Sequence, residues 1–569
     1  MIVDWDVPVE MSDGNVLRAD VFRPKGTDRY PVLLGLGPYA KGLPFPVGYP
    51  DQWRRLVESH PEVLSGSSGR YQNWEVPDPE KWVPEGYVCV RVDARGTGRS
   101  PGYLQHFAPR EVRDLYEAIE WAARQPWSNG KVGLSGVSYF AINSWLVAGL
   151  APPHLAAMIP WEGAADWYRD MTHHGGILST FWEHWYDKQV LPIQNGVGDQ
   201  SPVNPMTQEH VAGPETLSDA ERAAKRSDLG EEIRSHALDD GYHRERSADW
   251  TRVRVPFLSA ANWGGQGLHS RGNFEAFTEA TSAERWLEVH GNEHWTEYYT
   301  DYGIGLQKRF LERFLKGVKA SWGDVPRVRL QVRTIDGFRE RAENEWPLAR
   351  TDWTELYLNS TGRQLSPSPV ASEGSAEYDT SGDGVTFLRA AVTEETELTG
   401  PLAATLFVSS TTADADIFAV VRAFGPDGTE VVFQGALDPH TPVSQGWLRA
   451  SHRKLDPARS RPYRPFHTHD DPQPLTPGEV YELAVEIWPT SIVLPPGYRL
   501  ALTIRGRDYV YPGPIGEVRL TTFKNAFTGC GPFLHDDPRD RPPRLFDGRV
   551  AIWTGPRWPS RLLAPFIPR

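Results

Sequence analysis

The first 160 residues alternate short apolar runs with amphipathic stretches, and this alternation predicts strands and helices in turn. Residues 16–22 alternate apolar and polar side chains with period two, whereas residues 31–37 and 87–93 are continuous apolar runs suited to central strands. Residues 112–123 have helical spacing, with Leu115, Ile119 and Ala122 on one face. The alternation is typical of an α/β fold built on a doubly wound parallel sheet.

The stretch 131–143 predicts a strand, a sharp turn and a helix, with Ser138 at the turn and Gly136 two residues before it. This is the layout of a nucleophile elbow, in which a tight turn lifts a serine hydroxyl out of the backbone. The sequence departs from the common Gly-x-Ser-x-Gly, because Phe140 takes the last glycine's place and the small residue is Ala141. The alternative is a strand–helix junction with an incidental serine.

The pattern changes twice further along the chain. Strand signals disappear after residue 162 and return at residue 255, and beyond residue 325 short alternating runs are separated by Gly, Pro, Asp and Ser. Such runs predict an all-β sandwich or jelly roll. We therefore expect the first part of the α/β core at 1–162, a helical cap at 163–250, the second part of the core at 251–324, and the sandwich at 325–569.

Composition narrows the function classes. A chain of 569 residues is too long for one core, and its net charge of −14 argues against a general nucleic-acid binder. The most apolar region, 145–161, is broken by prolines, so we expect no membrane span. The N-terminus lacks the features of a signal peptide, which favours a cytoplasmic protein. Two cysteines imply no disulfide framework.

Six short motifs occur in an order that resembles one family over nearly the whole chain. They are Met11-Ser-Asp-Gly-Asn-Val-Leu-Arg-Ala-Asp-Val-Phe-Arg-Pro, Pro38-Tyr-Ala-Lys, Asp93-Ala-Arg-Gly-Thr-Gly-Arg-Ser-Pro-Gly, Gly136-Val-Ser-Tyr, Leu398-Thr-Gly-Pro-Leu and Leu494-Pro-Pro-Gly-Tyr-Arg-Leu. Together they resemble the cocaine esterase and X-prolyl dipeptidyl-peptidase family of serine hydrolases. The resemblance implies an α/β-hydrolase domain with an inserted helical cap and a C-terminal jelly roll.

The resemblance also implies roles for four residues. Ser138 would be the nucleophile, and the Tyr39 hydroxyl and the Tyr139 backbone N–H would form the oxyanion hole; alternatively, Tyr39 is a turn tyrosine that packs beside Pro38. The family's base histidine aligns with His294. His290 competes for that role, but it falls at the end of a predicted strand. The two histidines lack the His-Glu-x-x-His pattern, so we expect no metal.

The acid of the triad is where the sequence departs from the family. Gly265 stands where relatives carry an aspartate, and no Asp or Glu occurs between residues 255 and 273. Glu162 ends the strand predicted to lie beside both the serine strand and the strand that begins at 255, so its carboxylate could reach the far nitrogen of His294. We therefore hypothesise that Glu162 is the acid. Asn262, Asp166 and a dyad without an acid remain alternatives.

These residues predict a serine hydrolase that needs no cofactor and cleaves an ester or amide through an acyl-enzyme. Its expected partners are small esters, amides or short peptides, with no nucleic acid and no membrane; a homo-oligomer stays open. We favour an esterase or acylase, because nothing indicates a proline pocket. The alternatives are an X-prolyl dipeptidyl-peptidase-type aminopeptidase and a catalytically weak binding protein. We also expect Asp93, Arg95 and Asp114 to form an internal ion-pair network.

Overall fold

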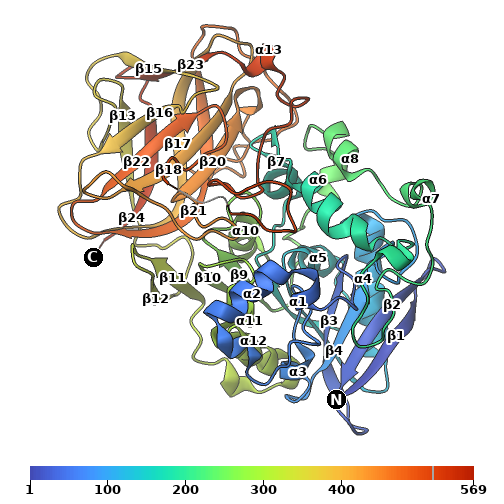
Figure 1. The fold of residues 1–569 in the computed structure, drawn as a ribbon. Helices are drawn as coiled ribbons and strands as arrows, with labels where there is room; N and C mark the ends of the chain where they lie inside the picture. The colour runs from blue at the N-terminus through green and yellow to red at the C-terminus, as the bar shows by residue number, and fades with distance from the viewer. Residues whose placement is uncertain (515–517, 569) are drawn as a thin grey trace.

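Two large sheets organise the chain in the computed structural model, which describes residues 1–514 and 518–568 (Figure 1). The first sheet has ten strands in the order β1-β2-β4-β3-β5-β6-β9-β10-β11-β12. All pairs from β4 to β11 in this order are parallel, and both edges are antiparallel. The strands are β1 (Ile2–Glu10), β2 (Val16–Arg23), β3 (Tyr30–Gly37), β4 (Val88–Asp93), β5 (Ser128–Val137), β6 (Leu155–Trp161), β9 (Phe257–Asn262), β10 (Arg285–His290), β11 (Val328–Arg333) and β12 (Phe338–Glu343).

The central strands of this sheet are buried because helices cover them. Every residue of β4 and of β9 is buried, as expected for parallel strands with both faces covered. α5 packs on β5 and β6, and α10 packs on β9. The principal helices are α2 (Pro50–Ser59), α4 (Pro109–Ala123), α5 (Tyr139–Ala148), α10 (Arg271–Glu279) and α12 (Asp301–Leu311). The alternating strand and helix pattern read from residues 1–162 is therefore present.

Two segments without long strands lie over the carboxyl ends of the parallel strands. The first joins β3 to β4 and carries α1 (Phe45–Gly48), α2 and α3 (Pro79–Trp82). The second joins β6 to β9 and is the expected cap, along one side of the molecule in Figure 1. Its elements are short: β7 (His173–His174), β8 (Ile177–Leu178), α6 (Phe181–Trp185), α7 (Asp219–Ala223), α8 (Leu229–Ser235) and α9 (Gly241–Arg244).

The second sheet has twelve strands and folds into a sandwich, because β17 pairs with β24 and closes the path. Its interior is a separate apolar cluster that includes Leu406, Ile487 and Leu502. The strands are β13 (Asp352–Asn359), β14 (Gln364–Ser366), β15 (Gly374–Asp379), β16 (Val385–Arg389), β17 (Thr396–Ser410), β18 (Asp416–Phe424), β19 (Glu430–Val431), β20 (Ser444–Arg449), β21 (Tyr481–Leu494), β22 (Arg499–Arg505), β23 (Arg549–Thr554) and β24 (Arg561–Ile567).

The expected start of the sandwich at residue 325 is too early. β11 pairs in parallel with β10, with Leu287 opposite Val328, and β12 completes the edge of the first sheet. The sandwich strands begin only at Asp352. A short run of alternating apolar and polar residues has the same sequence pattern whichever sheet it joins. Its partner strand is set by contacts with residues distant in sequence, so the pattern does not assign the run to a sheet.

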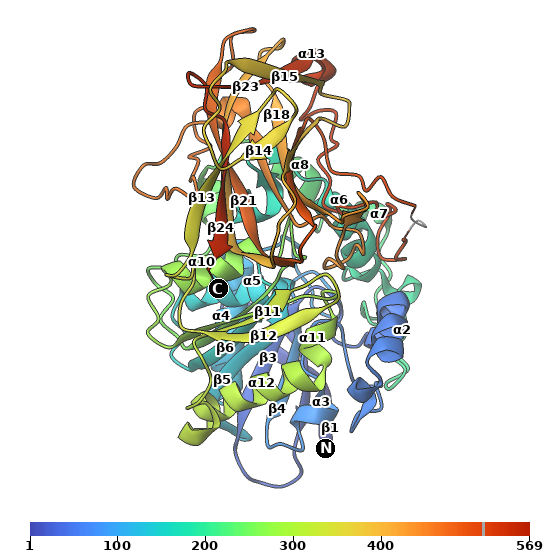
Figure 2. The same ribbon diagram turned by 90° about the vertical axis from the view of Figure 1, so that its left-hand side faces the viewer.

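The two sheets are joined at the carboxyl edge of the first. In Figures 1 and 2 the sandwich lies above that sheet, with α10 between them. A sandwich loop makes two backbone hydrogen bonds there: Ala436 N–H donates to the Gly264 carbonyl over 3.0 Å, and His294 N–H donates to the Ala436 carbonyl over 2.9 Å. The loop therefore fixes the backbone of two turns that follow β9 and β10. Among the described residues, no helix combines the length and apolar character needed to cross a bilayer.

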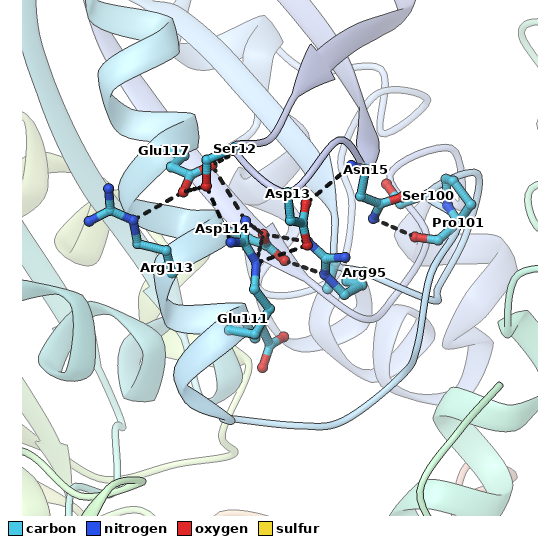
Figure 3. Close-up of polar contacts among 12 residues, drawn as sticks. Ser12, Asp13, Asn15, Arg95, Ser100, Pro101, Glu111, Arg113, Asp114 and Glu117 are labelled. Atoms are coloured by element: carbon cyan, nitrogen blue, oxygen red, sulfur yellow. Dashed lines mark hydrogen bonds and ion pairs between the residues drawn. The ribbon is translucent and has the colours of Figure 1, made fainter.

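An ion-pair network ties α4 to the loops that follow β1 and β4 (Figure 3). Asp114 is fully buried and accepts two hydrogen bonds from the Arg95 guanidinium, each 2.8 Å long, while Arg95 also pairs with Asp13. Asp93 accepts from the backbone N–H groups of Lys41 and Arg99. The expected pairing of Arg95 with Asp114 is confirmed, and it holds the loops that follow β1 and β4. Asp93 does not join these ion pairs, because its carboxylate is bound by backbone N–H groups.

Replacing Asp114 with alanine should lower the free energy of unfolding by about 3 kcal/mol, because it removes one member of a buried pair and leaves Arg95 without its main acceptor. Arg113→Gln is the matched control, because it breaks an ion pair with Glu117 on the same helix. The Arg113 side chain is 49% exposed, so this change should lower the free energy of unfolding by about 0.5 kcal/mol or less. Urea unfolding followed by circular dichroism measures both values. Equal losses would contradict the assignment of Asp114 as the anchor.

Candidate active site

Ser138 stands at a strained turn between β5 and α5. Its φ of 54° and ψ of −111° lie outside the regions that most side chains adopt, and such strain persists only where neighbouring contacts enforce it. Ser138 N–H donates to the Trp161 carbonyl, and Val137 N–H donates to the Glu75 carbonyl, each over 3.0 Å. These bonds connect the turn to β6 and to the loop before α3. The strand, turn and helix read from the sequence are present.

The structure explains how a phenylalanine occupies the position of the motif's last glycine. The Phe140 ring lies over β3, where a Cβ on Gly37 would come within 2.6 Å of the ring and one on Gly35 within 3.2 Å. A Cβ on Gly136 would lie 2.5 Å from the Cβ of Phe140. The bulk of Phe140 is therefore accommodated by glycines in the neighbouring strand, and the turn keeps its shape.

The imidazole that contacts Ser138 is His269, which the sequence reasoning did not single out. The Ser138 hydroxyl and His269 Nε2 are 3.0 Å apart, within hydrogen-bond distance. His269 is 3% exposed, and its Nδ1 is buried without a hydrogen-bond partner. It lies in the turn after β9, in the segment where the family's aspartate is absent. A Cβ at Gly265 would come within 3.1 Å of the His269 Cβ, so a side chain at 265 and this histidine compete for the same space.

His294, the expected base, lies directly behind His269. The two rings are stacked, with centroids 4.4 Å apart and planes inclined by 24°. His294 does not bond to Ser138 in this arrangement: Nδ1–H donates to Glu162 over 2.8 Å and Nε2–H donates to Glu75 over 2.9 Å. Both carboxylates are buried. The histidine is thus held between two acids, one at each nitrogen.

Glu162 occupies the place that the sequence reasoning gave it, at the carboxyl end of β6. It is fully buried and adopts a φ of 50°, with its N–H bonded to the Ala260 carbonyl at 2.7 Å. Three N–H groups donate to its carboxylate: His294 Nδ1, His290 Nε2 at 2.9 Å and Asn262 Nδ2 at 3.1 Å. A buried carboxylate needs such donors to remain ionised. Its role as the acid stays a prediction.

The other candidates for the acid, Asn262 and Asp166, and the competing base His290 lie elsewhere or bond differently. Asn262 bonds to Glu162 and to the Asn292 carbonyl, and not to an imidazole. Asp166 caps the helical turn that follows it and pairs with Arg169, so its carboxylate is used inside the cap. His290 lies at the end of β10, where its Nδ1–H donates to Glu288 over 2.7 Å. It holds Glu162 from the side opposite His294.

The charges in this group set the protonation states. Burial opposes a charge on His294, but Glu162 and Glu75 outweigh burial and raise the pKa of His294 to about 9. Burial likewise opposes charge on His290, and Glu288 and Glu162 raise its pKa to about 10. Burial would raise the pKa of Glu162, but the two histidines hold it well below its usual value. Glu162 is therefore ionised between two cationic imidazoles.

The pKa values of His269 and Glu75 are shifted in the direction that favours the neutral form of each side chain. Burial, reinforced by the adjacent His294, lowers the pKa of His269 well below its ordinary value. Burial raises the pKa of Glu75. A neutral His269 has a free lone pair at one nitrogen, which can accept the hydrogen bond of the Ser138 hydroxyl.

The two expected oxyanion donors flank Ser138. Tyr139 is the first residue of α5, where backbone N–H groups lack helical partners. The Tyr39 hydroxyl lies in the same cavity as Ser138, and Tyr39 is 7% exposed. Only the backbone N–H of Tyr139 is an expected donor. Its side-chain hydroxyl is directed elsewhere and donates to the Glu111 carboxylate over 2.7 Å. Tyr39, Tyr139 and Ser138 line one cavity, and the oxyanion role of the two tyrosines stays a prediction.

The cavity above Ser138 contains about 480 Å³ free of atoms and is lined mainly by apolar and aromatic side chains. They come from the cap, from the β3–β4 segment and from the C-terminal region. Among the described residues, the lining comprises Tyr39, Gln52, Trp74, Glu75, Ser138, Tyr139, Ile142, Phe181, Trp182, Trp185, Gln189, Leu268, His269, His294, Leu437 and Phe523.

Glu75 and His269 are the two ionisable residues of the described cavity lining that the sequence reasoning missed. His269 was detectable as the one ionisable side chain in the turn after β9, close to the unoccupied aspartate position. Glu75 offers no such signal, because it lies in an irregular loop 63 residues before Ser138. Its φ of 65° marks it as strained, but only the fold reveals this.

One group of side chains has the donor set of a zinc site. Single ligand atoms of Glu162, His269 and His294 lie within 4.8 Å of one another. However, both nitrogens of His294 already bond to carboxylates, and His269 bonds to Ser138. The residues are therefore better matched to holding protons than a metal, and the expectation that no metal is needed stays a prediction.

Comparisons with known proteins agree on one family. Residues 13–296 match the X-Pro dipeptidyl-peptidase (S15) family, and residues 320–563 match its C-terminal non-catalytic domain. The cocaine esterase of Rhodococcus is 25% identical, covering 99% of this chain and 98% of its own, and a putative serine esterase of Mycobacterium bovis is 26% identical, covering 90% and 92%. A CocE/NonD family hydrolase from Staphylococcus aureus is 32% identical, with a TM-score of 0.84, covering 100% of this chain and 94% of its own.

Replacing Glu162 with glutamine should lower the pKa of His294 from about 9, because the amide removes the negative charge at Nδ1. Histidine-labelled protein followed by NMR through a pH titration measures this value. Glu288→Gln is the control: Glu288 bonds to His290 and not to His294, so it should lower the pKa of His290 and leave that of His294 nearly unchanged. An unchanged His294 pKa in Glu162→Gln would contradict the assigned pairing.

Proposed function

This chain belongs to the cocaine esterase and X-prolyl dipeptidyl-peptidase family of serine hydrolases, and from that premise we propose that it hydrolyses esters with an apolar or aromatic group through an acyl-enzyme on Ser138. The observation that carries the proposal is the position of the Ser138 hydroxyl. It lies at a strained strand-to-helix turn, bonded to an imidazole and facing an apolar cavity. That environment supplies a nucleophile, a proton acceptor and a binding site together.

The arrangement of strands supports an α/β-hydrolase core. The parallel strands β3, β5, β6, β9 and β10 are neighbours in the first sheet, and Ser138, Glu162 and His294 follow three of them at their carboxyl ends. Ligands of open α/β sheets bind at this edge. The proposed nucleophile and acid follow the neighbouring strands β5 and β6, and the proposed base follows β10, which is separated from β6 by β9. The three residues occur in the chain order serine, acid, histidine.

In the proposed reaction His294 first loses its Nε2 proton to solvent as Nε2 leaves Glu75. Ser138 Oγ then attacks the carbonyl carbon of the ester, and the hydroxyl proton passes to the free Nε2 of His294. The negative charge on the carbonyl oxygen is stabilised by the Tyr39 hydroxyl and the Tyr139 N–H, each donor contributing about 3 kcal/mol. His294 then returns the proton to the departing alcohol oxygen, and the C–O bond breaks to leave the acyl-enzyme. Water repeats the same steps to release the acid and free Ser138.

We assign the base role to His294 because it is the imidazole with an ionised carboxylate at its far nitrogen. Glu162 stabilises the imidazolium that forms when the proton is accepted. His269 has no partner at Nδ1 and a depressed pKa, so it is poorly suited to hold a proton. We propose that His269 aligns the hydroxyl of Ser138 in the free enzyme. His294 takes over that bond when its Nε2 leaves Glu75.

The composition of the cavity favours esters with an apolar group over peptides with a free amine. Phe181, Trp182, Trp185, Leu268 and Phe523 line it, and burial of an aromatic or aliphatic group against them is favourable. Within the described lining Glu75 is the one carboxylate, and it already accepts a hydrogen bond from His294. An aminopeptidase needs a carboxylate available to the substrate's ammonium group, and the second oxygen of Glu75, Oε2, is buried without a hydrogen-bond partner. The preference for esters therefore rests on the apolar lining, and the peptidase remains the second candidate.

Labelling with a fluorophosphonate tests the nucleophile and the base. Wild-type protein should gain one adduct by intact mass, and Ser138→Ala should gain none. His294→Gln should slow labelling about a thousandfold, whereas His269→Gln should slow it about tenfold, because the first loses the base and the second only an aligning hydrogen bond. If the wild-type protein gains no adduct, the binding-protein alternative is favoured. If labelling slows more in His269→Gln than in His294→Gln, the base is His269.

Replacing Glu75 with glutamine should move the acidic limb of the kcat/KM profile to lower pH. A base must be neutral to accept a proton, so activity rises as pH passes the pKa of His294, which lies at about 9 with Glu75 in place. Removing this negative charge lowers that pKa, and the rise in activity then comes earlier. Glu293→Gln is the control, because its carboxylate bonds to Thr296 and not to His294. If the acidic limb of the kcat/KM profile lies at the same pH in Glu75→Gln as in the wild type, Glu75 does not affect the pKa of the base.

A further inference from the structure

The cap contributes one indole N–H to the proposed oxyanion hole. Trp185, the last residue of α6, donates its Nε1–H to the hydroxyl oxygen of Tyr39 over 3.2 Å. Both side chains are buried, with Trp185 3% and Tyr39 7% exposed. Their residues are 146 positions apart in the chain, so the bond exists only because the cap folds over the carboxyl edge of the first sheet.

This hydrogen bond determines what the Tyr39 hydroxyl can do. A phenol has one proton to donate and an oxygen that also accepts. Since the Trp185 N–H approaches that oxygen, the hydroxyl proton is directed to a different acceptor. The carboxylate of Glu75 is the acceptor beside the hydroxyl in the free protein, so an oxyanion would replace it there. Both Tyr39 and Glu75 line the cavity with Ser138. Donation to the oxygen also polarises the O–H bond and makes it a stronger donor.

Trp185 packs against both tyrosines of the proposed oxyanion hole. Its ring meets that of Tyr39 edge-on, with centroids 6.3 Å apart, and lies parallel to that of Tyr139, with centroids 5.9 Å apart. The Tyr139 ring is fixed from behind, because its hydroxyl donates to Glu111 and lies 2.9 Å from His106 Nδ1. Glu111 comes from α4 and is directed away from the Asp114 network in Figure 3. One indole therefore contacts the side chains of both tyrosines, and it bonds directly only to the Tyr39 hydroxyl.

We propose that Trp185 is a positioning residue of the oxyanion hole, and that it acts on the reaction through the hydroxyl of Tyr39. The proposal rests on the proposed function, in which Tyr39 donates to the oxyanion. It makes the cap a part of the catalytic machinery as well as a wall of the binding cavity. The cap would then influence the rate of the chemical step, and not only the affinity for substrate.

A double-mutant cycle tests this coupling with a 4-nitrophenyl ester as substrate. Trp185→Phe keeps an aromatic ring and removes the N–H, so kcat should fall about three- to tenfold while KM changes little. Tyr39→Phe removes the donor itself and should lower kcat by about a hundredfold or more. In the Tyr39→Phe background, Trp185→Phe should have almost no further effect on kcat, because the hydroxyl on which it acts is gone.

Trp182→Phe is the matched control from the same helix. Its indole also lines the cavity, but its N–H donates to the Met171 carbonyl over 2.7 Å, so any effect on kcat should be equal in both backgrounds. If Trp185→Phe lowers kcat by the same factor in the wild-type and Tyr39→Phe backgrounds, the proposal is overturned and Trp185 is only a packing residue. If Tyr39→Phe retains full kcat while Ser138→Ala is inactive, the oxyanion role of Tyr39 fails and this proposal with it, but the serine hydrolase stands.

Discussion

The buried carboxylate of Glu162 is the interaction on which the rest of the site depends. An ionised group with no exposure to water is tolerable only if hydrogen bonds and opposite charges replace the solvent. Here three N–H donors do so, from His294, His290 and Asn262. Because the donors come from the ends of β9 and β10 and from the loop after β10, the carboxylate fixes the positions of the turns that surround Ser138.

The backbone around the cavity stores strain at the residues that carry the chemistry. Ser138, Glu162, Glu75 and Asn292 all have φ values between 50° and 68°, where side chains other than glycine are disfavoured. Each such residue costs about 1–3 kcal/mol, which the surrounding structure must offset. The backbone bonds from Ser138 to Trp161 and from Glu162 to Ala260 show how the sheet does this. Ser138 and Glu75 line the cavity, and Glu162 and Asn292 lie behind it in the hydrogen bonds around His294 and Asn262.

Three separate parts of the chain build one site. The cap supplies Trp185, the segment between β3 and β4 supplies Glu75, and the C-terminal region supplies Leu437 and Phe523. The sandwich also bonds through Ala436 to the backbone of His294. The domain that matches the family's non-catalytic part therefore closes the cavity and supports the loop of the proposed base.

The sequence by itself determined the local elements and the residue types of the site. Short apolar runs bounded by turn residues located β5, α5 and β6, and most positions of all three are buried. The elbow spacing and the absence of an aspartate at 265 directed attention to Ser138 and Glu162, and the structure brings Glu162 into contact with His294. These inferences need only the order of strands and helices along the chain and the rule that the carboxyl ends of parallel strands lie at the same edge of a sheet.

Only the tertiary structure decided which side chains touch. The contact between His269 and Ser138 depends on the path of the turn after β9, and the position of Glu75 depends on a loop without periodicity. The pairing of β11 with β10, rather than with the sandwich, depends on hydrogen bonds between strands that are distant in sequence. Such contacts are set by packing and by the satisfaction of buried polar groups over the whole molecule, and no local pattern in the chain encodes them.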